Sequence, residues 1–380
     1  MKFKILIIIL CLIITFSVTV SAKEELLVED AKAAVLIEPE TMQVLYSKAP
    51  YEKLEPASLT KIMTMILVCE AIDENILALD QMLTTSEYAQ SMGGTNIYLE
   101  AGEKMSVEDL LKSVAIASAN DAAVVLAEGI SGSVSNFVKK MNDKAKELKL
   151  TNTSFKNPNG LPESDHYTCA MDMAIMSAHL INEYKDIIIP YTSRYEDYVR
   201  EDTTKRFWLV NRNKLVRFLD GVDGLKTGWT QNAGYCISAT INKNNMRFIA
   251  VVMKCSTPSN RLKEATQMLN YAVNNYQTVE LYKAQDIIKT YENINFVPKK
   301  YHLVVKENIY IIKKKSDTLT NITVEENINY SNILENPGTI KVFINGKLYN
   351  EYELEVLEYL KKASFFDILK EVLLEIFLVS

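Results

Sequence analysis

The chain has 380 residues and a formal net charge of −6, and 48% of its residues are hydrophobic. That share is ample for a folded core, and the length exceeds that of one typical domain, so we expect two domains. The acidic balance excludes nucleic acid as an expected partner.

The first 22 residues have the pattern of an export signal. Lys2 and Lys4 precede an apolar run over residues 5–16, and small residues at 20–22 come before the charged Lys23. We therefore expect cleavage after Ala22. Removing two of the 42 basic residues leaves 40 against 48 acidic ones, a net charge of −8 for residues 23–380. An uncleaved anchor is the alternative, but the run is short for a membrane span of roughly 20 residues.

Residues 23–280 are predicted to form a first domain. Alternation over residues 33–37 and 43–47 indicates a hairpin. Residues 58–72 are apolar on nearly every face, as in a buried helix. The later elements are helices at residues 107–117, 121–128, 134–148 and 170–181, a strand pair at 234–241 and 248–255, and a helix at 261–276. Strands from both ends, with helices between, predict an α+β (α/β) fold in which helices flank a central antiparallel sheet.

Residues 281–360 are predicted to form a small all-β domain. Short strand-like runs occur at residues 301–305, 309–313 and 319–324. Asn345-Gly346 lies between the runs 340–344 and 347–355 and is a strong signal for a type I′ hairpin.

The tail, residues 361–380, is predicted to be an amphipathic helix on a membrane surface. Its polar stripe consists of Asp367, Lys370, Glu371 and Glu375, and apolar side chains cover the remaining faces. These four charges argue against a membrane span, and the acidic excess removes electrostatic help from anionic lipid within the tail itself. A helix packed on its own domain is the alternative.

Cysteine and histidine give no pattern for a metal site. Buried thiols are the preferred interpretation of the four cysteines left after cleavage, with one or two disulfides still open; they are Cys69, Cys169, Cys236 and Cys255. The three histidines, His166, His179 and His302, are scattered. We expect no zinc site, no other cofactor and no Ser-His-Asp triad.

Three short motifs carry the chemistry. Ser58-Leu59-Thr60-Lys61, Ser118-Ala119-Asn120 and Lys226-Thr227-Gly228 each occur once in residues 23–380. A Ser-x-x-Lys at a helix start places the amine beside the hydroxyl on one face. The same order of motifs is found in β-lactamases and penicillin-binding proteins, with Asp where this chain has Ala119.

Longer stretches around these motifs resemble the D-alanyl-D-alanine carboxypeptidases, the low-molecular-weight penicillin-binding proteins of the serine-peptidase type. The matching stretches are residues 56–64, 117–123, 157–161, 221–230 and 233–236. The resemblance covers residues 30–280 closely and implies a penicillin-binding/β-lactamase-like catalytic domain. Thr168-Cys169-Ala170 departs from the family's usual Ser-Thr-Ala, which puts the packing of that loop in doubt.

The resemblance implies removal of the terminal D-alanine from peptidoglycan pentapeptides through an acyl-enzyme on Ser58, which penicillin would also acylate. Lys61 is the expected base. It accepts a proton only when neutral, so its pKa must lie about 3 units below the ordinary 10.4 to be half neutral near pH 7. Burial and the Lys226 cation can lower it.

The resemblance also implies the remaining roles. Ser118 relays a proton to the leaving D-alanine, and Asn120 holds the peptide and Lys61. Lys226 and Thr227 bind the terminal carboxylate, and Gly228 leaves room beside the substrate. The backbone amides of Ser58 and Trp229 form the oxyanion hole. Asp121 is expected to cap the following helix. Arg194 and Arg261 could assist with the carboxylate, but exposed salt bridges are the preferred interpretation of both.

Three alternatives stay open from sequence. A class A β-lactamase needs a deacylating Glu, and Glu163 follows a poor context for one. A transpeptidase shares the acylation step. A non-catalytic wall-binding protein would need neither Ser58 nor Lys61. We expect an exported protein at the outer face of the cytoplasmic membrane or in the cell-wall space, with the stem peptide and β-lactams as ligands.

Overall fold

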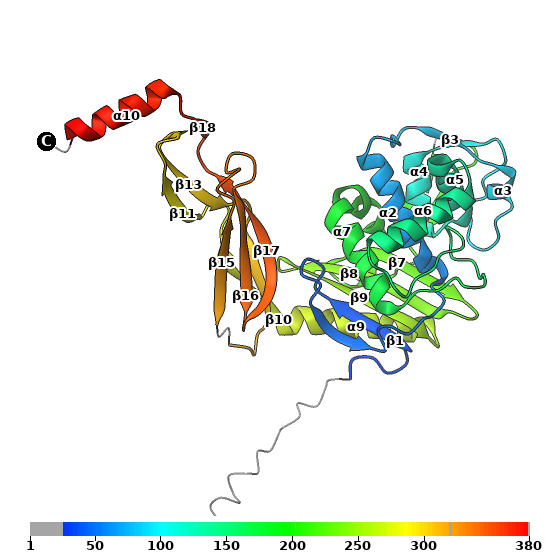
Figure 1. Ribbon diagram of the computed structural model, residues 1–380. Helices are drawn as coiled ribbons and strands as arrows, with labels where there is room; N and C mark the ends of the chain where they lie inside the picture. The colour runs from blue at the N-terminus through cyan, green and yellow to red at the C-terminus, as the bar shows by residue number, and fades with distance from the viewer. Residues whose placement is uncertain (1–25, 202, 319–320, 379–380) are drawn as a thin grey trace, which may run out of the picture.

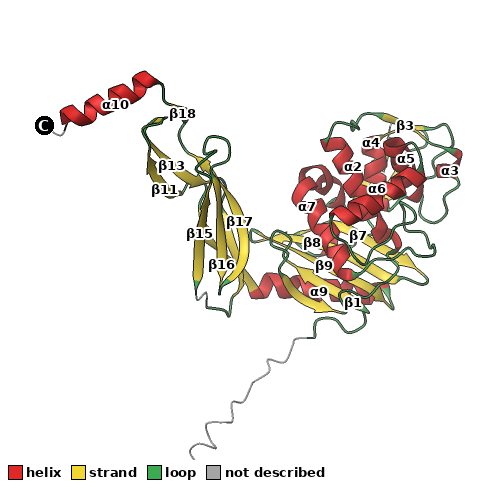
Figure 2. Cartoon of the chain, viewed as in Figure 1, coloured by secondary structure: helices red, strands yellow, loops and turns green. Residues whose placement is uncertain are grey.

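The computed structural model describes residues 26–201, 203–318 and 321–378. The expected signal at residues 1–22 lies outside them. A helix-and-sheet part and an elongated β part lie side by side, and a single helix stands at the far end of the β part (Figure 1). The first part combines a sheet with helices packed on it, whereas the second consists of strands (Figure 2).

Five antiparallel strands form the central sheet of the first part. Their order is β2-β1-β9-β8-β7, from β1 (Ala33–Ile37), β2 (Val44–Lys48), β7 (Val222–Thr230), β8 (Gly234–Lys243) and β9 (Met246–Cys255). The strands come from both ends of the segment, which confirms the predicted α+β fold with a central antiparallel sheet. In this order β7 is an edge strand.

Helices cover both faces of this sheet and create two cores. The larger core lies between one face and the helical layer, whose central helices are α2 (Lys61–Asp73), α5 (Asn120–Ser131) and α7 (Ala170–Thr192). Alternate residues of β8 and β9 point to the other face, where they pack against α9 (Pro258–Asn275). Helix α2 has ten buried side chains among its 13, as expected of a helix that is apolar all round.

The remaining elements of the first part are short or peripheral. They are β3 (Met82–Thr84), α3 (Glu87–Gln90), β4 (Lys104–Ser106), α6 (Val134–Glu147), β5 (Glu196–Val199), β6 (Phe207–Val210) and α8 (Leu215–Phe218).

Two predicted helices differ from their observed form. The helix expected at 107–117 is α4 (Val107–Lys112), which continues as the π-helical turn η2 (Ser113–Ala117). The helix expected at 170–181 extends to Thr192, with a non-helical Tyr184 where two helical pieces meet. Beyond this break Ile187, Ile188 and Ile189 pack on the core, and this tertiary contact extends the helix.

The second part contains a five-stranded sheet of order β11-β13-β17-β16-β15, with its own core. Its strands are β11 (Ile287–Glu292), β13 (Lys300–Val305), β15 (Ile322–Ile328), β16 (Gly338–Ile344) and β17 (Lys347–Val356). Asn345 and Gly346 both have positive φ, 52° and 75°, as a type I′ turn requires. β12 (Phe296–Val297) pairs with β18 (Lys361–Lys362) beside this sheet.

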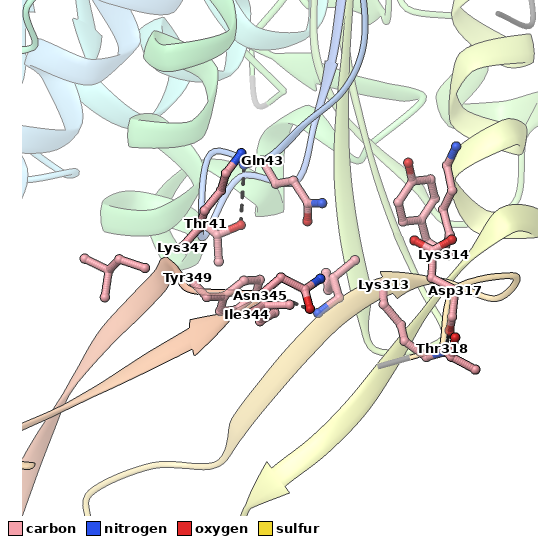
Figure 3. A pocket seen from close by; sticks show the side chains of 13 residues that line it. Thr41, Gln43, Lys313, Lys314, Asp317, Thr318, Ile344, Asn345, Lys347 and Tyr349 are labelled. Carbon is pink, nitrogen blue, oxygen red and sulfur yellow. Dashed lines mark hydrogen bonds between the residues drawn. The ribbon is translucent and has the colours of Figure 1, made fainter. Parts of the chain in front are cut away.

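The two parts meet directly after α9. β10 (Tyr276–Tyr282) follows α9 and pairs with β14 (Ile309–Lys314), and Ile312 of β14 joins the core under α9. A cavity of about 600 Å³ lies at this junction (Figure 3). Thr41 and Gln43 of the first part face Lys313, Asn345 and Lys347 of the second across it.

Candidate active site

The candidate nucleophile lies in a tight turn that precedes α2. Ser58 is half-buried within the turn η1 (Ala57–Thr60), between the buried residues Ala57 and Leu59. Ala57 has a φ of 49°, in the left-handed region that non-glycine residues rarely adopt. This backbone conformation leaves Ser58 partly accessible at the start of a buried helix.

Lys61 is fully buried one turn later, with three polar atoms around its amine. Nζ lies 3.2 Å from Oγ of Ser58 and donates to Oδ1 of Asn120 and to the carbonyl of Asn159, each over 2.6 Å. Burial lowers the pKa of Lys61 well below its ordinary value, the Lys226 cation lowers it further, and Asp121 opposes them. A neutral amine has two hydrogens, which match the two acceptors, and one lone pair for the Ser58 hydroxyl.

The second motif faces Lys61 from the turn between η2 and α5. Ser118 has a φ of 68°, and Asn120 begins α5. The Asn120 amide donates to the carbonyl of Gly93 over 2.7 Å, so its Oδ1 is fixed toward Lys61. The side chain of Ala119 is fully buried in the core.

The expectation that Asp121 caps α5 is wrong, because Ala119 is the N-cap residue. The buried Asp121 carboxylate accepts from the backbone amides of Ile97 and Leu99. It therefore fastens the loop before β4 to α5.

The third motif lies on β7, the edge strand nearest the Ser58 turn. Lys226 is buried and donates to the carbonyl of Thr227 over 3.0 Å. Burial, followed by the nearby Arg212 and Arg261 cations, lowers the pKa of Lys226 to about 7. The site therefore holds several basic groups close together, which suits a carboxylate ligand.

Gly228 allows close approach of β7 to the nucleophile turn. A Cβ at this position would lie 3.0 Å from the carbonyl oxygen of Pro56 and 3.1 Å from the amide nitrogen of Ser58. We expected this glycine to leave room for substrate. The structure shows that it makes room for the Ser58 backbone, and the room for substrate stays a prediction.

A cavity of about 370 Å³ opens beside these motifs. Four predicted site residues line it: Ser118, Thr227, Gly228 and Trp229. Its other lining residues are Thr95, Tyr195, Val210, Asn211, Arg212, Lys214 and Arg261. The eight predicted site residues thus come from three separate segments, and hydrogen bonds or shared cavity walls bring them together.

Arg261 differs from its expected exposed salt bridge. It is only 9% exposed, and its guanidinium lies over the Tyr235 ring, 5.8 Å from the centroid. Arg194 does form the expected exposed ion pair, with Asp197.

Arg212 was missed by sequence reasoning. Its neighbours Asn211 and Asn213 are buried and donate to backbone carbonyls of Thr192 and Gly224, which fixes the turn. The sequence feature that could have identified Arg212 is its position between two asparagines, ten residues before β7.

The histidines and cysteines take structural positions. The Nε2 atom of His166 lies 2.8 Å from Oγ1 of Thr60, and its Nδ1 accepts from the amide of Lys156.

The four cysteines at 69, 169, 236 and 255 are buried free thiols, which resolves the question of disulfides. Cys169 caps α7 by accepting from the amide of Asp172, so the departure at Thr168-Cys169-Ala170 leaves the loop intact.

No cluster of metal-ligating side chains occurs among residues 26–201, 203–318 and 321–378. Glu163, the candidate deacylating residue of a β-lactamase, is exposed and accepts a hydrogen bond from Asn157. Its side-chain hydrogen bond is thus to Asn157, not to Ser58.

Solved structures share this fold. Penicillin binding protein 5 from Haemophilus influenzae has a TM-score of 0.71 and 29% sequence identity, over 88% of this chain and 98% of that one. DacD from Francisella tularensis, a D-alanyl-D-alanine carboxypeptidase, has a TM-score of 0.66 and 27% identity, over 88% and 94%. The fold class is therefore that of penicillin-binding serine peptidases.

Sequence comparison defines the family. The model of the D-alanyl-D-alanine carboxypeptidases, Peptidase_S11, matches residues 18–257. DacF of Bacillus subtilis (strain 168), a D-alanyl-D-alanine carboxypeptidase, is 45% identical over 371 residues, 94% of each chain. DacC of Escherichia coli (strain K12) is 32% identical over 89% of this chain and 86% of its own. The chain belongs to the D-alanyl-D-alanine carboxypeptidase family of serine-type hydrolases, which confirms the predicted family, activity and enzyme class.

Proposed function

We propose that Ser58 is the nucleophile of this carboxypeptidase and that Lys61 is its base. The observation that carries the proposal is the 3.2 Å separation of Lys61 Nζ and Ser58 Oγ at a buried site, where burial and the Lys226 cation lower the pKa of the amine. Ser58 Oγ attacks the carbonyl carbon of the penultimate D-alanine while Lys61 takes the hydroxyl proton. The bond to the terminal D-alanine then breaks, and Ser118 relays the proton from Lys61 to the leaving amine, which restores the neutral base. Water hydrolyses the resulting ester and regenerates Ser58.

The cavity supports a binding mode for the substrate. The terminal carboxylate of the substrate would lie against Thr227, Arg212 and Arg261, with Lys226 behind these three residues. Asn120 would hold the peptide. The free edge of β7 can pair with an extended peptide, as in β-strand addition. The amides of Ser58 and Trp229 stabilise the tetrahedral oxyanion, since Gly228 allows the two backbones to approach closely.

The ligands we propose are peptidoglycan stem peptides and β-lactams. Penicillin-binding protein D2 from Listeria monocytogenes has been solved in ampicillin-bound and cefotaxime-bound forms. It is 31% and 30% identical in these two forms and covers 63% of this chain. A β-lactam would acylate the same hydroxyl, Ser58.

The location we propose is the outer face of the cytoplasmic membrane. Residues 1–22 would direct export, residues 23–280 catalyse, and residues 281–360 hold the catalytic domain away from the membrane. α10 (Phe365–Leu378) would lie on the bilayer, because Phe365, Phe366 and Phe377 are 72%, 78% and 72% exposed. No helix within the described ranges is long and apolar enough to cross a membrane.

Two variants test the catalytic assignment. Ser58→Ala should abolish both D-alanine release from a stem pentapeptide and covalent penicillin labelling, with the melting temperature unchanged. Lys61→Arg should also inactivate, because a guanidinium stays protonated near neutral pH. Penicillin labelling of Ser58→Ala would refute the nucleophile, and acylation of Lys61→Arg within about tenfold of the parent rate would refute the base.

A further inference from the structure

Four exposed lysines lie on α10, on the short strand that precedes it, or on the strand that follows β12, in an otherwise acidic protein. They are Lys300 at the start of β13, Lys361 and Lys362 of β18, and Lys370 on the helix itself. The pairing of β12 with β18 sets Lys361 opposite Val297 and Lys362 opposite Phe296, which brings positions separated by some 60 residues of sequence together. We call these four residues the basic collar. Within the described ranges, none of the four makes an ion pair within 4 Å, although Lys361 and Lys370 act electrostatically on the Asp367 carboxylate.

The helix is held in a defined orientation beside the collar. Ser364 and Asp367 cap its start reciprocally: the Asp367 carboxylate accepts from the Ser364 amide over 2.9 Å, and the Ser364 hydroxyl accepts from the Asp367 amide. Near its other end, Glu375 forms an ion pair with Lys299 of the β12–β13 turn. Glu375 therefore faces the β part, while apolar side chains of α10 remain exposed; Phe366 is 78% exposed and Ile376 62%.

We propose that the basic collar and the outward face of α10 form one docking surface for a bilayer that contains anionic phospholipid. The inference rests on the proposed membrane attachment and adds lipid selectivity to it. The helix alone carries three acids and one base, so by itself it would be repelled by anionic headgroups. Lys299 neutralises Glu375, and the collar outweighs Asp367 and Glu371.

The collar can reach the same interface as the phenylalanines. Lys362 lies three residues before Phe365, a chain distance of at most about 11 Å, and lysine side chains extend toward headgroups while their stems lie on apolar surface. Glu292, opposite Lys300 in register, is the acid that faces the collar from β11. Each lysine near an anionic surface strengthens binding roughly fivefold.

Vesicle binding tests the proposal. Residues 23–380, the chain after the expected cleavage, are titrated with vesicles of phosphatidylcholine and with equimolar phosphatidylcholine and phosphatidylglycerol. We expect the protein to bind the mixed vesicles at least about tenfold more tightly than the phosphatidylcholine vesicles. This preference should disappear when the salt concentration is raised. Substitution of the three strand lysines, Lys300→Gln, Lys361→Gln and Lys362→Gln, should remove most of this preference and leave binding to phosphatidylcholine unchanged.

The matched control also removes three exposed lysines, here in the catalytic domain. Its substitutions are Lys139→Gln and Lys140→Gln on α6 and Lys149→Gln just after it. It should keep the preference for anionic vesicles, and both variants should release D-alanine at the parent rate. Equal binding of the parent to the two vesicle types, or an equal loss in the control, overturns the collar while attachment through α10 stands. A parent protein that binds neither vesicle overturns the membrane attachment as well.

Discussion

Lys61 donates a hydrogen bond to the side-chain oxygen of Asn120 over 2.6 Å, and both side chains are buried. The acceptor is a neutral amide, so it orients the amine without the strong preference for an ammonium ion that a carboxylate would impose. A unit charge about 4 Å away would contribute about 4 kcal/mol at an effective dielectric constant of 20. An asparagine here therefore leaves the pKa of Lys61 low, as burial sets it, where a carboxylate would raise it.

Asn120→Asp should raise the pKa of Lys61 and slow acylation at neutral pH. Because the neutral amine is the active form, the raised pKa moves the acid limb of the pH–rate profile to higher pH, and activity recovers as the pH rises. We expect a shift of at least about one unit, or roughly tenfold in rate on the acid side. Penicillin acylation rates across pH measure it. An unshifted acid limb would show that Lys61 is not the titrating base.

Gly160→Ala should disrupt the nucleophile turn. Gly160 has a φ of 85°, and a Cβ there would lie 1.9 Å from the carbonyl oxygen of Ala57. Gly132→Ala is the matched control, since Gly132 has a similar φ of 72° with nothing within 4 Å of its Cβ. The control should cost about 1–2 kcal/mol in the free energy of unfolding. Gly160→Ala should cost more and abolish penicillin labelling; equal effects of the two changes would contradict the steric argument.

Local patterns were enough to find the motif residues and most helices. Ser58 and Lys61 are one turn apart, so their proximity follows from spacing alone. The residue pattern did not predict the strand β7, because its sequence mixes Asp223, Gly224, Lys226 and Gly228 with apolar residues and shows no alternation. It is a strand because it pairs along its length with β8.

The sequence alone could not predict where the fold places charged side chains. Arg261 looks like any exposed arginine of an amphipathic helix, and only the packing of α9 on the sheet buries it beside Tyr235. The basic collar depends on the pairing of two-residue strands, too short to be recognised from composition.

His166 should make the catalytic domain sensitive to acid. Burial lowers the pKa of His166 to about 4, against about 6.5 in an unfolded chain. Its contribution to stability is therefore fully present above pH 6.5 and is lost as the pH falls toward 4, by about 3 kcal/mol. His166→Gln should flatten the pH dependence of the free energy of unfolding over this interval, as followed by urea melts. Parallel pH profiles for the two proteins would show that His166 does not carry the effect.

Arg261 should recognise the free carboxylate of the substrate. Its side chain is buried beside the catalytic cavity, and within the described residues its Nε has no hydrogen-bond partner. A buried cation that lacks a carboxylate partner gains most from a ligand that supplies one. Arg261→Gln should therefore lower kcat/KM for a peptide ending in D-alanyl-D-alanine roughly 10- to 100-fold.

The same peptide with an amidated C-terminus distinguishes carboxylate binding by Arg261 from a structural role of Arg261. This substrate has no terminal carboxylate, so it cannot lose a contact with Arg261. Its rate of hydrolysis should be nearly the same in the parent and in Arg261→Gln. The control, Arg194→Gln, removes an exposed arginine paired with Asp197 and should leave both substrates within about twofold of the parent. If Arg261→Gln slowed the two substrates equally, Arg261 would support the fold of the cavity and the carboxylate would be bound by Thr227 and Arg212 without it.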